Sequence, residues 1–195
     1  LIAQYNFVAS EAIMAMITKT IDPYYSGKCL RAAVKCFDWC NKNDKEAKTG
    51  IIGASLQAAV ELYKTTKDDA YRNFATDKAL NIRQLQASGL NDLPGGFFYT
   101  SVDKKEPYKD IWHGCLELIS VCDLLKIFPA NKDVPVWKEI VSDYSRLYLK
   151  AFSEKNSFGI VPFGLFTGND PGGSRKAGNY WYRYFMQPEL SWWVG

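Results

Sequence analysis

The residues best suited to chemistry in this sequence are aromatic and lie near its C-terminal end. The stretch 178–185 reads Gly-Asn-Tyr-Trp-Tyr-Arg-Tyr-Phe and follows a glycine-rich loop, 168–175. Tyrosine and tryptophan combine a flat apolar ring with a polar tip, and a sugar ring offers matching apolar faces and hydroxyl edges. We therefore predict that Tyr180, Tyr182 and Arg183 line a carbohydrate-binding cleft. The alternative is that part of this stretch is core, because four residues fall near helical spacing: Trp181, Tyr184, Phe185 and Pro188.

A second group of candidate binding residues lies in and just after a long irregular segment, 88–109. Trp112 and His113 stand at the predicted start of a helix, where a histidine can bond a sugar hydroxyl or orient a carboxylate. Simple packing of both side chains is the alternative. Tyr99 and Tyr108 belong to the irregular segment, and we predict that their rings wall the same cleft.

Three other patterns resemble catalytic or phosphate-binding motifs, but structural roles are favoured for them. Asp68 and Asp69 lie on a short turn between predicted helices, where helix capping explains an acidic pair. The run 172–176, Gly-Gly-Ser-Arg-Lys, lacks the spacing of a phosphate-binding P-loop. Asp103 and Glu106 lie beside two lysines and are expected to form a solvated charge cluster.

Composition and charge exclude several classes of protein. The chain has 195 residues, enough for one domain with a sizeable core. Its net charge of +3 is small and its lysines are scattered, so no nucleic acid partner is expected. No apolar run is long enough to span a membrane. With five cysteines, one histidine and no Cys-x-x-Cys motif, neither a zinc site nor complete internal disulfide pairing is expected, and no cofactor is predicted.

Hydrophobic residues recur at helical spacing along most of the chain and predict six helices, with a seventh starting near Asn179. The six predicted ranges are 3–20, 26–41, 48–65, 69–86, 111–128 and about 134–154. Ser26 and Asp110 are the expected N-caps of the second and fifth helices. The run 160–163 contains a proline and is predicted to be a short edge strand.

The predicted helices form repeated pairs. Residues 12–25 align with 58–71, and 118–137 form a looser third copy, which is typical of stacked αα-hairpins. Connections within pairs are short and those between pairs mostly long, so the long loops should gather above the N-termini of the odd-numbered helices. These helices carry fewer charges and are expected to form an inner layer. The pattern predicts an all-α fold, either a closed toroid or an open solenoid.

Several segments resemble the central part of family 9 glycoside hydrolases. They are Asn6-Phe7-Val8-Ala9, the turn 22–25, the run from Cys29 to Trp39, and 58–63. The resemblance implies an (α/α)6 toroid of αα-hairpin repeats with long loops on one face. It also implies a hydrolase acting outside the cell or in the periplasm on oligosaccharides of β-linked glucan or related plant polysaccharide. Residues 1–195 are then the central part of one catalytic domain, whose remaining parts are partners of this chain.

The same resemblance implies that no catalytic residue lies in the chain. The paired aspartates of the family belong to an Asp-Ala-Gly-Asp type of motif upstream of the part matched by Asn6, and its acid glutamate lies beyond the point matching Gly195. No Asp-Ala-Gly-Asp occurs here. We therefore expect the chain alone to be inactive. We also expect poor stability, since the flanks of the first and seventh helices, including Tyr5, Val8 and Trp181, would lack neighbours.

Two alternative functions remain open at the level of sequence. One is a helical-repeat scaffold that binds protein partners, and the other is a polysaccharide lyase on the same toroid fold. Scaffolds usually keep the loops between repeats short. The two long loops here, rich in glycine and aromatic residues, favour an enzyme.

Overall fold

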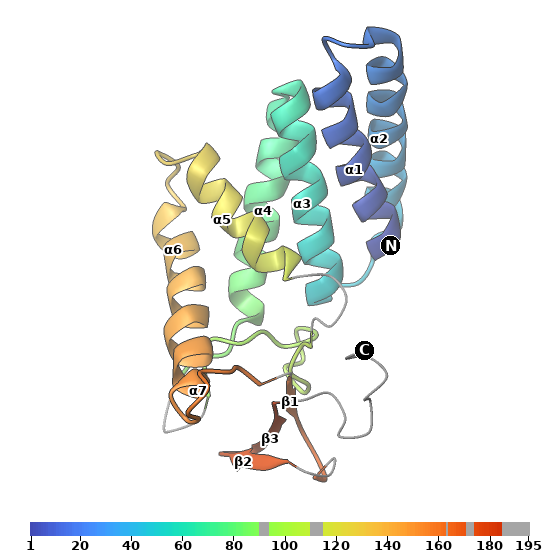
Figure 1. Cartoon of the computed structure of the whole chain (residues 1–195). Helices are drawn as coiled ribbons and strands as arrows, with labels where there is room; N and C mark the ends of the chain where they lie inside the picture. Colours follow the sequence, from blue (N-terminus) through green and yellow to red (C-terminus); the bar gives the residue numbers. More distant parts are fainter. Residues whose placement is uncertain (90–93, 110–114, 163, 171–173, 185–195) are drawn as a thin grey trace.

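The computed structural model describes residues 1–89, 94–109, 115–162, 164–170 and 174–184. The described chain folds into three helix pairs with a loop region and a small sheet at one end (Figure 1). The helices are α1 (Ile2–Thr18), α2 (Pro23–Asn43), α3 (Thr49–Thr66), α4 (Asp69–Leu85), α5 (Leu116–Ile127) and α6 (Val134–Asp143). The helix of α6 continues without a break as the π-helical segment η1 (Tyr144–Lys150) and the short α7 (Ala151–Ser153).

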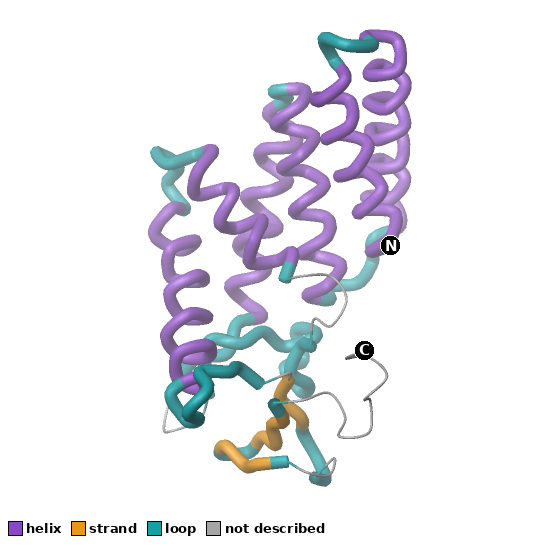
Figure 2. The backbone as a smooth tube through the Cα atoms, viewed as in Figure 1, coloured by secondary structure: helices purple, strands orange, loops and turns teal. Residues whose placement is uncertain are grey.

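The helices form two rows, as the loop lengths predict. In one row α1 packs against α3 and α3 against α5, while α2, α4 and α6 pack on the outside of their partners. The N-termini of α1, α3 and α5 lie at the same end as the loops and the sheet (Figures 1 and 2). The predicted inner layer and the predicted gathering of the long loops at the N-termini are therefore confirmed for these three helices.

Small residues allow the inner helices to approach closely. α3 is buried along almost its whole length, with alanines at many of its contact positions. Gly53 faces the start of α5, and a Cβ atom at this position would lie 2.8 Å from the backbone nitrogen of Glu117. The contact between α3 and α5 thus depends on the missing side chain.

The prediction that Tyr5 and Val8 lie on an exposed flank is wrong, because both side chains are fully buried. They point between α1 and its neighbours, and the Tyr5 ring packs edge-on against Phe37 of α2. The exposed apolar residues lie on another face of α1: Phe7, Met14 and Ile17, followed after the end of the helix by Ile21.

Two predicted helix starts need correction. Asp22, rather than Ser26, caps α2, and its side chain accepts a hydrogen bond from the backbone N–H of Tyr25 at 2.9 Å. Pro23 then occupies the first turn, where its missing N–H costs nothing. Ser26 is buried and instead donates a hydrogen bond to the Ala15 carbonyl, 2.6 Å away, which ties α2 to α1.

The second correction concerns α5, which begins at Leu116, five residues later than predicted. Its N-cap, Cys115, has a left-handed backbone with φ 55°. Asp110, the expected cap, lies outside the described residues. By contrast, Asp68 caps α4 as expected and accepts a hydrogen bond from the Ala70 N–H at 2.9 Å.

The predicted seventh helix is wrong, because its described part is a strand. β3 (Tyr180–Arg183) is the middle strand of an antiparallel sheet with β1 (Gly164–Phe166) and β2 (Arg175–Ala177). Gly178, with φ 58°, begins the two-residue turn that joins β2 to β3, and such turns favour positive φ. The described residues of the run 160–163 are not a strand; β1 starts at Gly164 instead.

The sheet and the loops rest on a second hydrophobic cluster, separate from the helix core. Its buried members are Ala87, Phe97, Tyr148, Phe152, Leu165, Ala177 and Tyr182. Because they come from the 86–109 segment, η1, α7 and all three strands, this cluster holds together parts of the chain that are far apart in sequence. The cluster therefore fixes the loop end of the molecule.

Candidate functional site

A cavity of about 180 Å³ lies at the loop end, between the 86–109 segment, the start of α5, η1 and the chain leading into β1. Two pairs of rings form its aromatic walls. Phe97 and Phe98 come from the irregular segment, and Tyr144 and Tyr148 come from η1. The cavity thus opens at the face where the sequence predicts a carbohydrate cleft.

Ring contacts join the two walls. The Phe98 and Tyr144 rings stack with their centres 5.6 Å apart and their planes 18° from parallel. The Phe97 and Tyr148 rings are 6.3 Å apart and tilted. Tyr144 and Tyr148 lie four residues apart on the π-helical segment, a form of helix that is often found at functional sites.

The polar groups of the cavity are few, and they differ in charge. Lys109 and Glu117 both line it. Glu117 is 2% exposed and lies in the first turn of α5, where the helix dipole favours a negative charge. Among the described lining residues Glu117 is the only carboxylate, so the cavity does not by itself contain an acid–base pair.

Three of the predicted binding residues lie in or beside this cavity. Tyr108 lines it directly. Tyr99 and Tyr180 lie next to Phe97, with ring centres 5.1 and 5.3 Å from its ring. Their hydroxyls form a hydrogen bond of 3.0 Å, and burial together with this bond raises the pKa of Tyr180 above its ordinary value. The structure therefore brings three tyrosines of the prediction to one side of the molecule.

The segment carrying Tyr99 is fixed to α3 and α4 by backbone hydrogen bonds. Tyr99 donates its N–H to the Leu85 carbonyl at 2.9 Å and accepts from the Thr49 hydroxyl at 2.5 Å. Thr49 also donates its own N–H to the Thr100 carbonyl, 3.0 Å away. The irregular segment is thereby attached to the rigid helices at the residue that carries the tyrosine.

The strand β3 separates the other two predicted residues. Tyr182 is 6% exposed and packs edge-on against Phe152, 4.9 Å away, inside the second hydrophobic cluster. Arg183 lies on the opposite face of the sheet, where its guanidinium is 5.1 Å from the centre of the Phe166 ring. The Lys109 ammonium group approaches the same ring to 4.4 Å. Trp112 and His113 lie outside the described residues.

Sequence reasoning missed several residues of the cavity. Tyr144 and Tyr148 fall at helical spacing within the predicted helix 134–154, and that spacing cannot tell a core from a cavity wall. Glu117 had one usable signal, an acidic residue in an otherwise apolar part of a helix, Leu116–Ile119. Such a residue is almost never buried without a partner or a function.

A wider groove of about 800 Å³ lies at the opposite end, between α4 and the turn that joins α5 to α6. Its lining mixes charges, with Arg72 and Lys132 near Asp77 and Asp133. It is far from every predicted binding residue that the structure describes. Within the described ranges, no helix is long and apolar enough to cross a membrane.

Comparison with models of known protein families gives a match over most of the chain. The sequence model of the family described as Glycosyl hydrolase family 9 matches residues 3–183, a span that includes the three helix pairs, the cavity and the sheet. No curated protein matched the chain.

Proposed function

Because the chain belongs to glycosyl hydrolase family 9, we propose that residues 1–195 form the central part of a catalytic domain that hydrolyses β-linked glucan or related plant polysaccharide. The chain contributes αα-hairpins of an all-α toroid, with its long loops on one face. The observation that carries the proposal is the family match over 3–183.

The contribution of this chain is substrate binding at the loop end. Tyr108 and the aromatic rings around Phe97 offer apolar faces on which a sugar ring packs. The tyrosines among them also offer hydroxyls as hydrogen-bond partners. Tyr99 and Tyr180 extend this surface. We assign Trp112 and His113 to the same role because they lie four and five residues after Tyr108 in the sequence.

Arg183 and Tyr182 have different parts in this proposal. Arg183 holds a cation on the outer face of the sheet, where it can reach a sugar hydroxyl. Tyr182 supports the site from beneath through its contact with Phe152. The two residues are neighbours in β3, and the alternation of side chains along a strand places Arg183 opposite Tyr182.

The catalytic acid and base come from parts of the domain other than these residues. Inversion at a glycosidic bond requires two carboxyl groups about 6.5–9.5 Å apart with water between them. The described cavity offers Glu117 alone. We further propose that the enzyme acts outside the cell or in the periplasm, where its polymeric substrate is found.

The test is an assay of the complete catalytic domain beside the 195-residue chain. The complete domain should release sugars with an inverted anomeric centre from a β-linked glucan, measured by NMR at early times, and the chain alone should release none. A product with a new carbon–carbon double bond would indicate a lyase instead. Stable capture of a protein, without any saccharide turnover, would favour the scaffold.

The site within the proposal is tested by Tyr108→Ala in the complete domain. Loss of one aromatic contact should weaken oligosaccharide binding by about 1–3 kcal/mol. Tyr24→Ala is the matched control, because Tyr24 is an exposed tyrosine on α2 at the other end of the array. Equal binding by both variants would remove Tyr108 from the site.

A further inference from the structure

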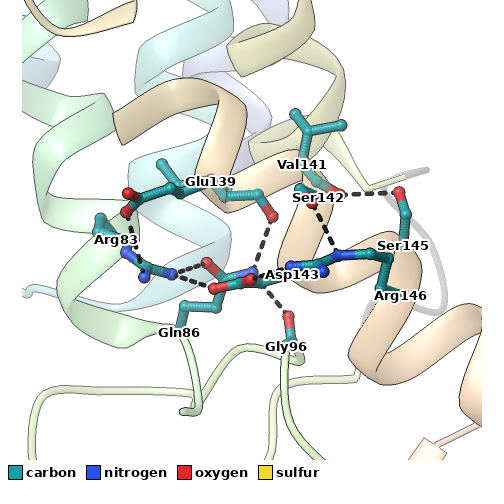
Figure 3. Close-up of polar contacts among 10 residues, drawn as sticks. Arg83, Gln86, Gly96, Glu139, Val141, Ser142, Asp143, Ser145 and Arg146 are labelled. Carbon is teal, nitrogen blue, oxygen red and sulfur yellow. Dashed lines mark hydrogen bonds and ion pairs between the residues drawn. The ribbon is translucent and has the colours of Figure 1, made fainter. Parts of the chain in front are cut away.

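A polar cluster connects α4, the irregular segment and α6 (Figure 3), and two of its residues, Gly96 and Asp143, directly precede residues that line the cavity. We propose that Arg83, Gln86 and Asp143 of this cluster are positioning residues that set the separation of the two aromatic walls. The part of this proposal that concerns substrate rests on the proposed function. The part that concerns geometry does not.

Gln86 uses its whole side-chain amide to join three segments. The residue follows α4 directly and is almost completely buried. Its amide nitrogen donates to the Gly96 carbonyl at 2.8 Å and to the Ile140 carbonyl at 2.9 Å. Its amide oxygen accepts from the Arg83 guanidinium at 2.7 Å. A single side chain therefore links the irregular segment to α6 and to α4.

Arg83 extends the link to the end of α6. One guanidinium nitrogen lies 2.9 Å from the Asp143 carboxylate, and the other is 3.5 Å from Glu139. Asp143 is also 3.5 Å from Arg146, on its other side. Figure 3 shows Arg83 pointing toward Gln86 and Asp143 together, so the ion pair and the amide form one connected network.

The network holds the residue before each wall of the cavity. Gly96 directly precedes Phe97 and Phe98, and Asp143 directly precedes Tyr144. Gly96 has φ 76°, and a Cβ atom there would lie 2.1 Å from the Asp143 carbonyl oxygen. The two backbones thus touch where the network joins them. A shift of either segment would change the distance between the Phe98 and Tyr144 rings.

A second buried ion pair on the same helix provides the contrast. Lys78 of α4 lies 3.0 Å from Asp44, in the connection between α2 and α3. This pair is at least as buried as the Arg83 pair, but neither of its members lines the cavity or precedes a residue that does. Lys78→Met therefore serves as a control for the general effect of breaking a partly buried ion pair on α4.

The decisive variant is Gln86→Glu, which has the same shape. The new carboxylate still accepts from Arg83, but it cannot donate to the Gly96 and Ile140 carbonyls. We expect amide hydrogen exchange of Gly96 and Tyr99 to become about tenfold faster, while amides of α1 and α3 keep their rates. Lys78→Met should leave the exchange of these two amides unchanged. Unchanged exchange in Gln86→Glu, or an equal rise throughout all helices, would overturn the proposal.

Kinetics in the complete domain test the link to substrate. With cellopentaose as the probe, Gln86→Glu should raise KM about tenfold and leave kcat within about twofold, because binding is lost equally from substrate and transition state. Asp143→Asn should show the same pattern with a smaller change. Equal changes in Gln86→Glu and Lys78→Met would indicate a merely structural role and overturn this part.

The failure of the two proposals can be distinguished. If the wild-type domain has no activity on β-linked glucans, the proposed function is wrong, and hydrogen exchange still decides whether the cluster positions the walls. If exchange rises as expected but KM for cellopentaose does not change, the cluster positions the walls and has no part in binding this substrate.

Discussion

The helix core and the second hydrophobic cluster, called the loop-end cluster from here on, are built from different kinds of residue. Among the described residues, four of the 22 buried members of the helix core are aromatic, whereas four of the seven in the loop-end cluster are. The helix core depends on alanines that let straight helices approach closely. The loop-end cluster joins the 86–109 segment to η1, α7 and three short strands, so large rings fill the space between these unlike elements.

This difference shows how a repeat fold acquires a site. The helix array supplies fixed attachment points, such as Thr49 and Gln86, and the ring cluster shapes the cavity between them. The array should therefore be the more stable part, and the loop end the part that opens first. The following predictions test this division, from the largest expected effect to the smallest.

The strongest test compares two fully buried rings, Trp137 of the helix core and Phe152 of the loop-end cluster. Each truncation to alanine should cost about 3–5 kcal/mol of stability. Trp137→Ala should lower the denaturant midpoint of the far-ultraviolet signal of the helices. Phe152→Ala should mainly lower that of the near-ultraviolet signal of the aromatic rings. Coincident midpoints in Phe152→Ala would show that the two parts unfold as one.

The junction between the parts is tested by Gly96→Ala. A left-handed backbone disfavours the new side chain by about 1 kcal/mol, and the overlap with Asp143 adds about 1–3 kcal/mol. Gly159→Ala is the matched control, because Gly159 also has a positive φ, 67°, but no atom within 4 Å of the new Cβ. A similar loss of stability in both variants, measured by urea unfolding, would mean that the close approach is unimportant.

Alkaline pH should destabilise the loop end more than the helix array, without any substitution. Burial is the largest cause that raises the pKa of Tyr144 and Tyr148 above the ordinary value of 10.0. The unfolded chain then loses these protons first. The stability they contribute is complete below about pH 10 and falls above it by about 1.4 kcal/mol per pH unit for each tyrosine.

Among the buried helix-core residues that the structure describes, Tyr5 is the one tyrosine whose pKa is raised to a similar degree, so the loop end should lose stability faster. The measurement is the urea midpoint of the ring signal and of the helix signal between pH 9 and about pH 11. A helix signal that falls first would contradict this order. Tyr148→Phe should reduce the slope for the ring signal.

The smallest effect is expected for Tyr99→Phe, which removes the hydrogen bond to the Tyr180 hydroxyl. The loss should be about 0.5–1.5 kcal/mol and confined to the ring signal. Tyr24→Phe, at an exposed tyrosine of α2, should change neither signal. A larger loss in the control than in Tyr99→Phe would rule out a structural role for the tyrosine pair.

The helix array could be predicted from sequence because the hydrophobic residues of each helix recur at helical spacing. Tyr5, Val8 and Ala12 recur as an amphipathic helix requires, and the short turns fix the pairing of neighbours. The errors occurred where several local readings compete. Asp22-Pro23 indicates a break after the first helix, which the structure has, but it is also a cap followed by a favourable first residue of the next helix, and the predicted start at Ser26 missed this second role.

The candidate site could be predicted only in part, because its geometry depends on contacts distant in sequence. Tyr99 and Tyr180 are 81 residues apart, and only the fold joins their hydroxyls. The strand Tyr180–Arg183 is four residues long, too short for a period of two to be told from a helical one. Substrate contact stays a prediction for all the predicted binding residues: Tyr99, Tyr108, Trp112, His113, Tyr180, Tyr182 and Arg183.

The π-helical segment Tyr144–Lys150 has a consequence for how the chain length can change. Each hydrogen bond of a π-helix spans one residue more than in an α-helix, so the segment accommodates an extra residue without turning the later side chains away from the core. Deleting the exposed Ser145 should convert it to α-helix and keep Phe152 buried. The same deletion in α3 would rotate every later residue by about 100°. Deletion of a single residue is therefore best tolerated in the wall of the cavity, where it alters the shape of the cavity and leaves the array intact.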